Sequence, residues 1–473
     1  MKNRTHFTAM LAILALAFSV VACSSDGGIN QDASDTNDPE TVDAIPPEIE
    51  HFVNPDESFF VGETLTIAVG YKDMLQSFAA RYMRENPGVT IEIISLEEDI
   101  ESDESWGSFR EQMGTQLMAG SGPILIDAML VDPLDPRSSG YFADWFPVMR
   151  ADPDFVESDW FMSVFHAVSV NDKLLSFPTS FSCEMVVANK IIPGLTEALA
   201  ERESVMVSEL VELQRSISTE GQYLFEPSNN IGRIVIWHYL SDFLDFKNGF
   251  VDFNNARFIE LLNSHKSIID RDKTVILGDV VSPDDEALVG ENYPFIFQLA
   301  TQWQYFLDFE ESLFTELTPI VNKRGELVMI PFESYVLNTN STNAEQSLAW
   351  DFLKFISDAD NNRLYSMGFQ PTNRGQHRSN VERFLPQYID EWIVGQFMWQ
   401  LNSPVEDMVE EAIARMSLYA EMPMYNALAL PDTIYEVLLN AMIDFDDGLV
   451  SAEETAANLQ NQVELIMMEM GLL

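Results

Sequence analysis

Four side chains suited to holding a polar small molecule come directly after predicted strands. Tyr71 and Lys72 follow the first strand of the chain, and Asp127 and Asp132 follow the third. A flat aromatic ring can stack on the apolar face of a sugar-like solute, while carboxylate, amide and hydroxyl groups hydrogen-bond its polar edge. These residue types therefore point to recognition of a polar solute rather than to catalysis.

Common catalytic motifs are missing from the sequence. It contains no Gly-x-Ser-x-Gly elbow, no His-Glu-x-x-His pair, no P-loop and no Cys/His cluster with zinc-binding spacing. The 76 acidic residues are so numerous that pairing two of them as glycosidase carboxylates carries no information. The run DFDDG at residues 444–448 has its glycine in fifth place, whereas a calcium-binding EF-hand loop needs it in sixth. We therefore expect no enzymatic activity, no metal and no other cofactor.

Strands and helices alternate in the segment that carries these four residues. Strands are predicted at residues 62–70, 89–96 and 124–131, with helices at 72–85 and 106–119 between them. This order predicts an α/β fold with a mostly parallel sheet and helices on both of its faces. Ligands of such sheets bind beyond the carboxyl ends of the strands, which is where residues 70–72 and 127–132 lie.

The chain is strongly acidic, with a formal net charge of −50 at pH 7. Such a surface repels nucleic acid and anionic lipid headgroups, which bind clustered Lys and Arg. We therefore expect no nucleic acid partner, and the charge favours neutral or cationic ligands.

Residues 1–22 are predicted to be a signal peptide that ends just before Cys23. A short positive segment precedes an apolar run at residues 7–21. The tetrad Val-Val-Ala-Cys resembles a bacterial lipobox, in which Cys23 carries a palmitate-type acyl anchor; a secretory signal with an incidental cysteine is the alternative. Residues 23–61, acidic and without Lys or Arg, are expected to be a disordered tether. The chain is thus expected to be exported and lipid-anchored to the cell membrane, on its extracellular or periplasmic face.

Several segments of the body resemble, in the same order, the extracellular solute-binding proteins of ABC transporters. NPGVTIEI, LMAGSGP and YFADWFPVM resemble the first lobe of family 1, the maltose-binding-protein-like carbohydrate group. Residues 176–190 resemble its crossover strand, 334–374 its return segment and 438–469 its C-terminal helices. The resemblance implies a two-lobed, periplasmic-binding-protein-like α/β fold of type II, with interleaved lobes and a hinge. One departure is Ile124, which stands where the family's Gly-Pro-Asp turn has its acid.

The resemblance adds ligand contacts to those that follow the strands. The family places contacts in the crossover strand, before an apolar run, at a tryptophan after a strand and at a ring ahead of the last helices. The residues of this chain at those places are Ser180, Phe181, Ser182, Asn229, Trp303 and Tyr425. Trp350, in a predicted amphipathic helix, is expected to anchor the core instead, and Cys183 to be a buried free thiol.

The resemblance divides each lobe between two segments of the chain. Lobe one is expected at 62–180 and 328–378, and lobe two at 181–327 and 379–473. It implies a monomeric receptor that captures a sugar or oligosaccharide in an interlobe cleft and delivers it to the permease subunits of an ABC importer. Two alternatives stay open: a peptide- or cation-binding or sensing protein of the same fold, and a surface enzyme acting on polysaccharide.

Replacing Trp303 by alanine is expected to weaken ligand binding while leaving folding intact. A stacking ring at the end of a strand contributes to the site and not to the core. Titration with the cognate ligand, alongside a thermal unfolding curve, tests this expectation. An unchanged affinity would remove Trp303 from the site.

Overall fold

The computed structural model describes twelve stretches of the chain. They are residues 60–70, 72–95, 103–135, 138–188, 194–200, 202–217, 239–276, 295–299, 318–358, 370–389, 404–426 and 429–473. The expectations for Cys23, Tyr71, Asn229 and Trp303, and for the signal peptide and tether, lie outside these residues.

The predicted strand and helix order at the start of the body is confirmed. The elements are β1 (Thr64–Val69), α2 (Asp73–Glu85), β2 (Thr90–Ser95), α3 (Asp103–Met118) and β3 (Leu125–Asp127). β1 lies between β2 and β3 and is parallel to both. β3 is shorter than predicted, because the Asp127 carboxylate accepts a hydrogen bond from Met129 N–H and a 3₁₀ helix, η1 (Ala128–Leu130), begins there.

The alternation of apolar side chains along β1 explains how this first sheet is covered. Leu65 and Ile67 are fully buried in one cluster with the helix side chains Phe78 and Tyr82. Ala68 points to the opposite face, where α3 supplies the cover. On this face, α3 contributes three buried side chains, Phe109, Met113 and Leu117. Period-two alternation in the strands thus gives a sheet buried on both faces.

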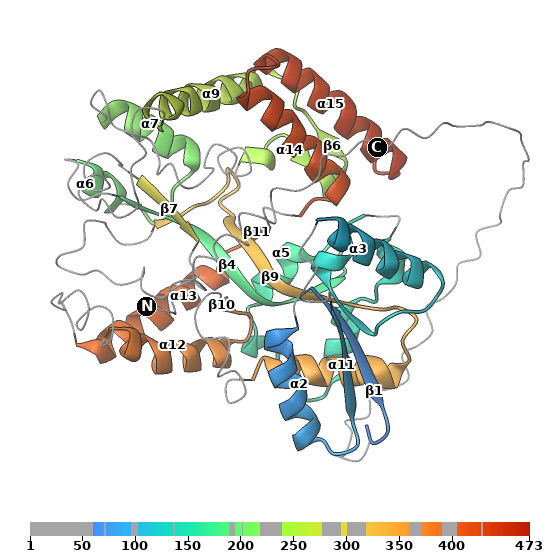
Figure 1. The fold of residues 1–473 in the computed structure, drawn as a ribbon. Helices are drawn as coiled ribbons and strands as arrows, with labels where there is room; N and C mark the ends of the chain where they lie inside the picture. The colour runs from blue at the N-terminus through green and yellow to red at the C-terminus, as the bar shows by residue number, and fades with distance from the viewer. Residues whose placement is uncertain are drawn as a thin grey trace, which may run out of the picture.

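Two long antiparallel strands, β4 (Ser176–Ala188) and β9 (Leu327–Leu337), connect the two halves of the molecule (Figure 1). Their register runs from Ser176 opposite Val336 to Cys183 opposite Met329. Beyond that stretch β4 pairs with β7 (Phe295–Leu299) and β8 (Thr318–Pro319), which belong to the second half. The other end of β9 pairs with β3 of the first half.

Short strands complete the pairing of these two. β10 (Gln370–Pro371) is antiparallel to β4, and β11 (Met424–Asn426) is parallel to the first residues of β9. A small separate hairpin joins β5 (Leu244–Asp245) to β6 (Phe250–Val251). Because β4 and β9 each contribute to both halves, the fold has two lobes that share a pair of strands.

The second lobe has a hydrophobic core of its own. It is covered by α9 (Ala256–Ile276), α14 (Asp432–Asp446) and α15 (Ala452–Glu469), which lie together at the top of Figure 1. Side chains of all three helices form one buried cluster, and they include Phe258, Ile434, Leu438, Leu459 and Val463. A capping box begins α15, with Ser451 and Glu454 each accepting a hydrogen bond from the other's backbone N–H.

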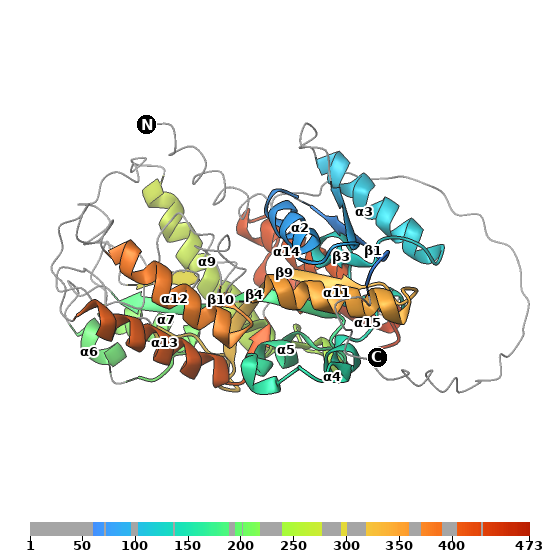
Figure 2. The same cartoon turned by 90° about the horizontal axis from the view of Figure 1, so that it is seen from below.

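Five further helices contribute side chains to the hydrophobic cluster that contains the core-facing residues of β4 and β9. They are α4 (Trp145–Ala151), α5 (Met162–Val168), α11 (Asn343–Ile356), α12 (Arg374–Tyr388) and α13 (Val405–Glu421). Figure 2 shows α12 and α13 running alongside each other near β10. Two further helices, α6 (Leu195–Ala200) and α7 (Val207–Ile217), follow β4. No helix within the described ranges is both long and apolar enough to cross a membrane.

The lobe boundaries expected from the sequence stay predictions. The boundary at 180/181 lies inside β4, and that at 327/328 lies at the first residues of β9. The boundary at 378/379 lies inside α12, which is one continuous helix. A strand shared by two lobes has no single dividing residue, so sequence position alone cannot fix these limits.

The prediction that Trp350 is a core anchor is confirmed. Its side chain is fully buried, with ring centroids 5.6 Å from Phe177 and 5.8 Å from Trp160. Its indole N–H donates to the Asp152 carboxylate at 2.8 Å, and that carboxylate also pairs with Lys354 at 2.6 Å. The indole of Trp350 therefore fills space in the core and also donates a hydrogen bond to the buried carboxylate of Asp152.

Trp350→Ala is expected to lower the free energy of unfolding by about 3–5 kcal/mol, the range for a large aromatic removed from a core. Urea denaturation measures the change. Leu418→Ala on α13, where the side chain is 65% exposed, is the matched control and should change stability by less than about 0.5 kcal/mol. Equal effects for the two variants would contradict the assignment of Trp350 to the core.

Candidate functional site

The shared strands present two chemically different faces. Along β4, Phe177, Phe181 and Cys183 belong to the hydrophobic core, so the alternate side chains point to the opposite side of the sheet. Paired residues in neighbouring strands point to the same side, and Ser180 pairs with Phe332 and Ser182 with Ile330. We call this second side the hinge face; its members are Ser180, Ser182, Glu184, Ile330 and Phe332.

The hinge face carries polar groups that the described protein does not saturate. Ser182 is fully buried, and its Oγ has no hydrogen-bond partner in the part of the chain that the structure describes. The Ser180 hydroxyl reaches the Phe332 carbonyl only at 3.4 Å. A buried hydroxyl without a partner is costly unless water or a ligand completes it. These two serines are therefore suited to hydrogen-bonding a bound solute.

Glu184 continues the same row of polar side chains toward lobe two. It is buried, and this burial raises the pKa of its carboxyl group from 4.5 to about 8. The group is thus mostly protonated at neutral pH, and a protonated carboxyl can donate as well as accept a hydrogen bond. The row Ser180, Ser182 and Glu184 is polar but uncharged in this state.

Two apolar side chains stand beside this row. Ile330 and Phe332 are half-buried, whereas the core-facing residues of β9 on either side of them, Met329 and Tyr335, are buried. An apolar ring and an aliphatic side chain next to hydroxyl and carboxyl groups make a floor of mixed character. Such a floor matches a molecule with C–H faces and hydroxyl edges.

Tyr425 lies at the lobe-two end of the same face. It pairs in parallel with Val328, and Val328 precedes Ile330 by two residues, so both point to the hinge-face side. Burial raises the pKa of the Tyr425 hydroxyl well above its ordinary value, a shift that nearby Arg324 opposes and Glu326 reinforces. The structure thus brings the predicted contacts Ser180, Ser182 and Tyr425 to one side of the sheet.

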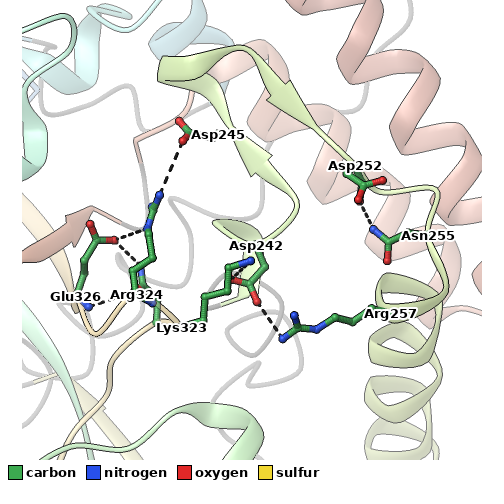
Figure 3. A network of polar contacts seen from close by, with 9 residues as sticks. Asp242, Asp245, Asp252, Asn255, Arg257, Lys323, Arg324 and Glu326 are labelled. Carbon is green, nitrogen blue, oxygen red and sulfur yellow. Dashed lines mark hydrogen bonds and ion pairs between the residues drawn. The ribbon is translucent and has the colours of Figure 1, made fainter.

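A network of ion pairs supports this end of β9 (Figure 3). The buried carboxylate of Asp242 pairs with Arg257 at 3.2 Å and with Lys323 at 3.1 Å. Next to it, Arg324 pairs with Glu326 at 2.9 Å. The Asp242–Lys323 ion pair therefore connects the turn that leads into β9 to the segment before α9.

Asp127 joins two loops of lobe one. Burial raises the pKa of its carboxyl group to about 6, although hydrogen bonds from Met129 N–H and Gly70 N–H lower it in part. Gly70 itself lies directly under the Trp106 ring, which a Cβ at this position would hit. Lys72 follows two residues later and is half-buried at the start of α2. Two of the predicted contacts, Lys72 and Asp127, thus lie at the carboxyl ends of the neighbouring strands β1 and β3.

Asp132 is engaged by the protein itself. Its Oδ1 accepts hydrogen bonds from Leu134 N–H at 3.1 Å and Asp135 N–H at 3.2 Å, and its Oδ2 accepts from Asp432 N–H at 2.9 Å. Burial, followed by the charge of Asp432, raises the pKa of Asp132 to about 6. The structure therefore shows Asp132 bridging to the start of α14.

Phe181 differs from its neighbours in the crossover strand. Its ring is fully buried and lies 5.9 Å from the Phe161 ring, in the core cluster. Because side chains of a strand alternate, Ser180 and Ser182 cannot share a face with the residue between them. The structure places Phe181 in the core and the two serines on the hinge face.

Sequence reasoning missed Glu184, Phe332 and Trp106. Glu184 follows Ser180 and Ser182 at the same two-residue spacing, so this alternation could have revealed it. Phe332 carries no such signal, because only the register between β4 and β9 places it beside Ser180.

Among the residues that the structure describes, no group of three or more His, Cys, Asp or Glu side chains could hold a metal ion. The expectation of a buried free thiol at Cys183 is confirmed.

Two α/β lobes joined by long shared strands define the periplasmic-binding-protein-like fold. Comparison with solved structures gives the particular relatives. Maltose-bound MalE3 of T. maritima matches with a TM-score of 0.51 and 16% identity, over 85% of this chain and 99% of that one. The sugar-binding protein MalE of Xanthomonas citri matches with a TM-score of 0.56 and 13% identity, over 86% and 98%.

A third relative has the same extent of similarity. A family 1 extracellular solute-binding protein of Bifidobacterium longum subsp. infantis matches with a TM-score of 0.52 and 13% identity, over 85% of this chain and 98% of that one. No protein-family model and no curated protein sequence matches the chain. The structural likeness confirms the predicted fold class, since it extends over almost the whole length of each relative.

Glu184→Gln is expected to stabilise the protein at neutral and alkaline pH. The native state holds the Glu184 proton more tightly than the unfolded state, so wild-type stability falls as pH rises between about 4.5 and 8. Glutamine removes this dependence, and we expect a gain of about 2–4 kcal/mol at pH 7.5 that vanishes near pH 4.5.

Urea unfolding at several pH values measures this difference. Glu436→Gln, on the exposed surface of α14, is the matched control and should follow the wild type at every pH. Parallel pH profiles for wild type and Glu184→Gln would contradict the burial of a protonated carboxyl on the hinge face.

Proposed function

We propose that the protein is an extracellular solute receptor that captures a sugar or oligosaccharide between its lobes and delivers it to an ABC importer. The hinge face carries this proposal. It combines the buried hydroxyl of Ser182, which has no partner in the described part of the chain, with the half-buried ring of Phe332 on two strands shared by both lobes. The named relatives, a maltose-bound MalE3 and a sugar-binding MalE, support the same class of ligand.

The state of the carboxyl groups favours a neutral ligand. A cationic solute would be held best by ionised carboxylates, but Glu184, the acid on the hinge face, has a pKa of about 8 and is mostly protonated at neutral pH. Hydroxyl and protonated carboxyl groups exchange hydrogen bonds with sugar hydroxyls without burying a net charge. We therefore favour a carbohydrate over a peptide or a polyamine.

Binding and transport are proposed to be coupled by closure of the lobes. A solute that contacts both lobes stabilises the closed arrangement in proportion to its differential affinity for the closed and open states. Closure would also exclude water from the hydrogen bonds at Ser180 and Ser182. The permease subunits would then distinguish a loaded receptor from an empty one by its shape.

The N-terminal segment supports a membrane-anchored location for the receptor. We propose that acylated Cys23 anchors a monomer to the outer face of the membrane and that residues 23–61 form its tether. The absence of catalytic motifs in the sequence supports binding without turnover.

A thermal-shift panel tests the proposed function. Mono- and oligosaccharides, including maltose and maltotriose, are compared with peptides and polyamines. A ligand that binds only the native state adds about 2.7 kcal/mol of stability at a hundredfold excess over Kd. A rise in Tm with one glycan class, without turnover, is expected. A rise with peptides or polyamines alone, or turnover of a glycan, would overturn the carbohydrate receptor.

Two variants then place the ligand on the hinge face. Ser182→Ala should leave the Tm of the ligand-free protein unchanged or raised, because it removes a buried hydroxyl without a described partner, yet weaken ligand binding about 5-fold. Phe332→Ala should weaken binding about 3- to 10-fold through lost stacking. Phe250→Ala, on β6 with its ring 46% exposed, is the control and should bind as the wild type does. Wild-type affinity in both hinge-face variants would move the ligand elsewhere.

A further inference from the structure

Two charged residues of lobe one contact the first residue of a lobe-two helix. Arg110 on α3 forms an ion pair with the carboxylate of Asp432, the first residue of α14. Asp132, in the loop after η1, accepts a hydrogen bond at 2.9 Å from the backbone N–H of the same residue. Asp432 is far in the sequence from both of them, since it lies 300 positions after Asp132.

The linked elements belong to different hydrophobic cores. The buried side chains of α3, such as Phe109 and Met113, lie in a cluster with Ala68 of β1. Those of α14, such as Ile434 and Leu438, lie in the cluster built with α9 and α15. The charged contacts therefore connect two bodies that are packed separately, rather than strengthening one core.

The N-terminus of α14 has no capping side chain of its own. Its N-cap residue is Pro431, which makes no side-chain capping hydrogen bond. The first N–H groups of a helix lack intrahelical partners, so an acceptor oxygen near them satisfies one of these donors. The carboxyl group of Asp132 supplies that acceptor from lobe one. When the lobes are apart, the Asp432 N–H loses this acceptor.

We propose that Arg110, Asp132 and Asp432 form an interlobe latch that favours the closed arrangement of the lobes before any ligand binds. The inference deepens the proposed function, since closure sets the affinity of the hinge face for its solute. The latch itself acts in the absence of ligand, so it can be tested independently.

The contacts are suited to a reversible latch. The side chains of Arg110 and Asp432 are 42% and 49% exposed, so water and salt screen their attraction. An exposed ion pair of this kind shifts an equilibrium by roughly 1.5- to 5-fold. The receptor can therefore open to admit a solute, and high salt should favour the open arrangement.

The latch is also expected to respond to pH. Asp132 faces Asp135 in its own loop and Asp432 on α14, while Arg110 on α3 faces Asp432. Burial and the two acidic neighbours raise the pKa of Asp132 to about 6 in the closed arrangement, against an ordinary value of 3.8. The charge of Asp432 and part of the burial are present only when the lobes are together, so the closed state binds the proton more tightly and closure is favoured as pH falls through about 6.

Small-angle X-ray scattering of the purified, ligand-free protein tests the latch. Arg110→Gln is expected to increase the radius of gyration at pH 7.5, and 0.5 M NaCl should do the same to the wild type, following about a 1.5- to 5-fold gain in the open state. Arg81→Gln removes an exposed ion pair within α2 and is the matched control, which should scatter as the wild type does. Identical scattering by Arg110→Gln and the wild type would overturn the latch.

A pH series separates the latch from a local structural role of Asp132. Between pH 7.5 and 5.5 the wild-type radius of gyration should decrease, and Asp132→Asn should lose that dependence. If Asp132 only shaped its own loop, the radius of gyration of Asp132→Asn would depend on pH in the same way as that of the wild type. This result would refute the proposal. The scattering experiments contain no sugar and test only the latch. A thermal-shift panel in which no ligand raises the Tm would therefore count against the proposed function and not against the latch.

Discussion

The antiparallel pairing of β4 with β9 is the constraint on which the rest of the structure depends. Its register puts Phe181 and Cys183 into the core and Ser180 and Ser182 on the hinge face. A slip of one residue would exchange these two sets, exposing aromatic surface and burying hydroxyls in the core. The same pairing thus determines the stability of both lobes and the chemistry between them.

Burial also changes the titration of three acidic side chains in and near the region between the lobes. The pKa values of Asp127, Asp132 and Glu184 are all raised, and burial is the largest cause in each case. The three acids nevertheless differ in use: Asp127 ties two loops of one lobe, Asp132 reaches the other lobe, and Glu184 lies on the shared strand. At pH 7 only Glu184, with a pKa of about 8, is mostly protonated, whereas Asp127 and Asp132, with pKa values of about 6, are mostly ionised.

Local sequence patterns predict the helices and strands, but they do not predict which side chains of different elements contact one another. The alternation at Leu65 and Ile67 and the Gly/Pro stops predicted β1, α2 and β2, and the amphipathic pattern around Trp350 predicted a core anchor. The place of Phe332 depends on a register with residues about 150 positions earlier, which no local pattern encodes. Asp132 was expected to face a ligand, but its partner is a helix start 300 residues away. Such pairings arise only when the chain is folded.

Glu333 shows how the joint between the lobes is stiffened. It lies opposite Thr179 in the middle of the shared strands, with a left-handed backbone (φ 47°), and its carbonyl accepts the Thr179 hydroxyl at 2.9 Å. Glycine would adopt this angle at lower cost but would also allow many others. A residue with a side chain narrows the paths along which the strand can bend. Fewer alternative conformations at this joint mean that less conformational entropy is lost when the two lobes are held in one relative orientation.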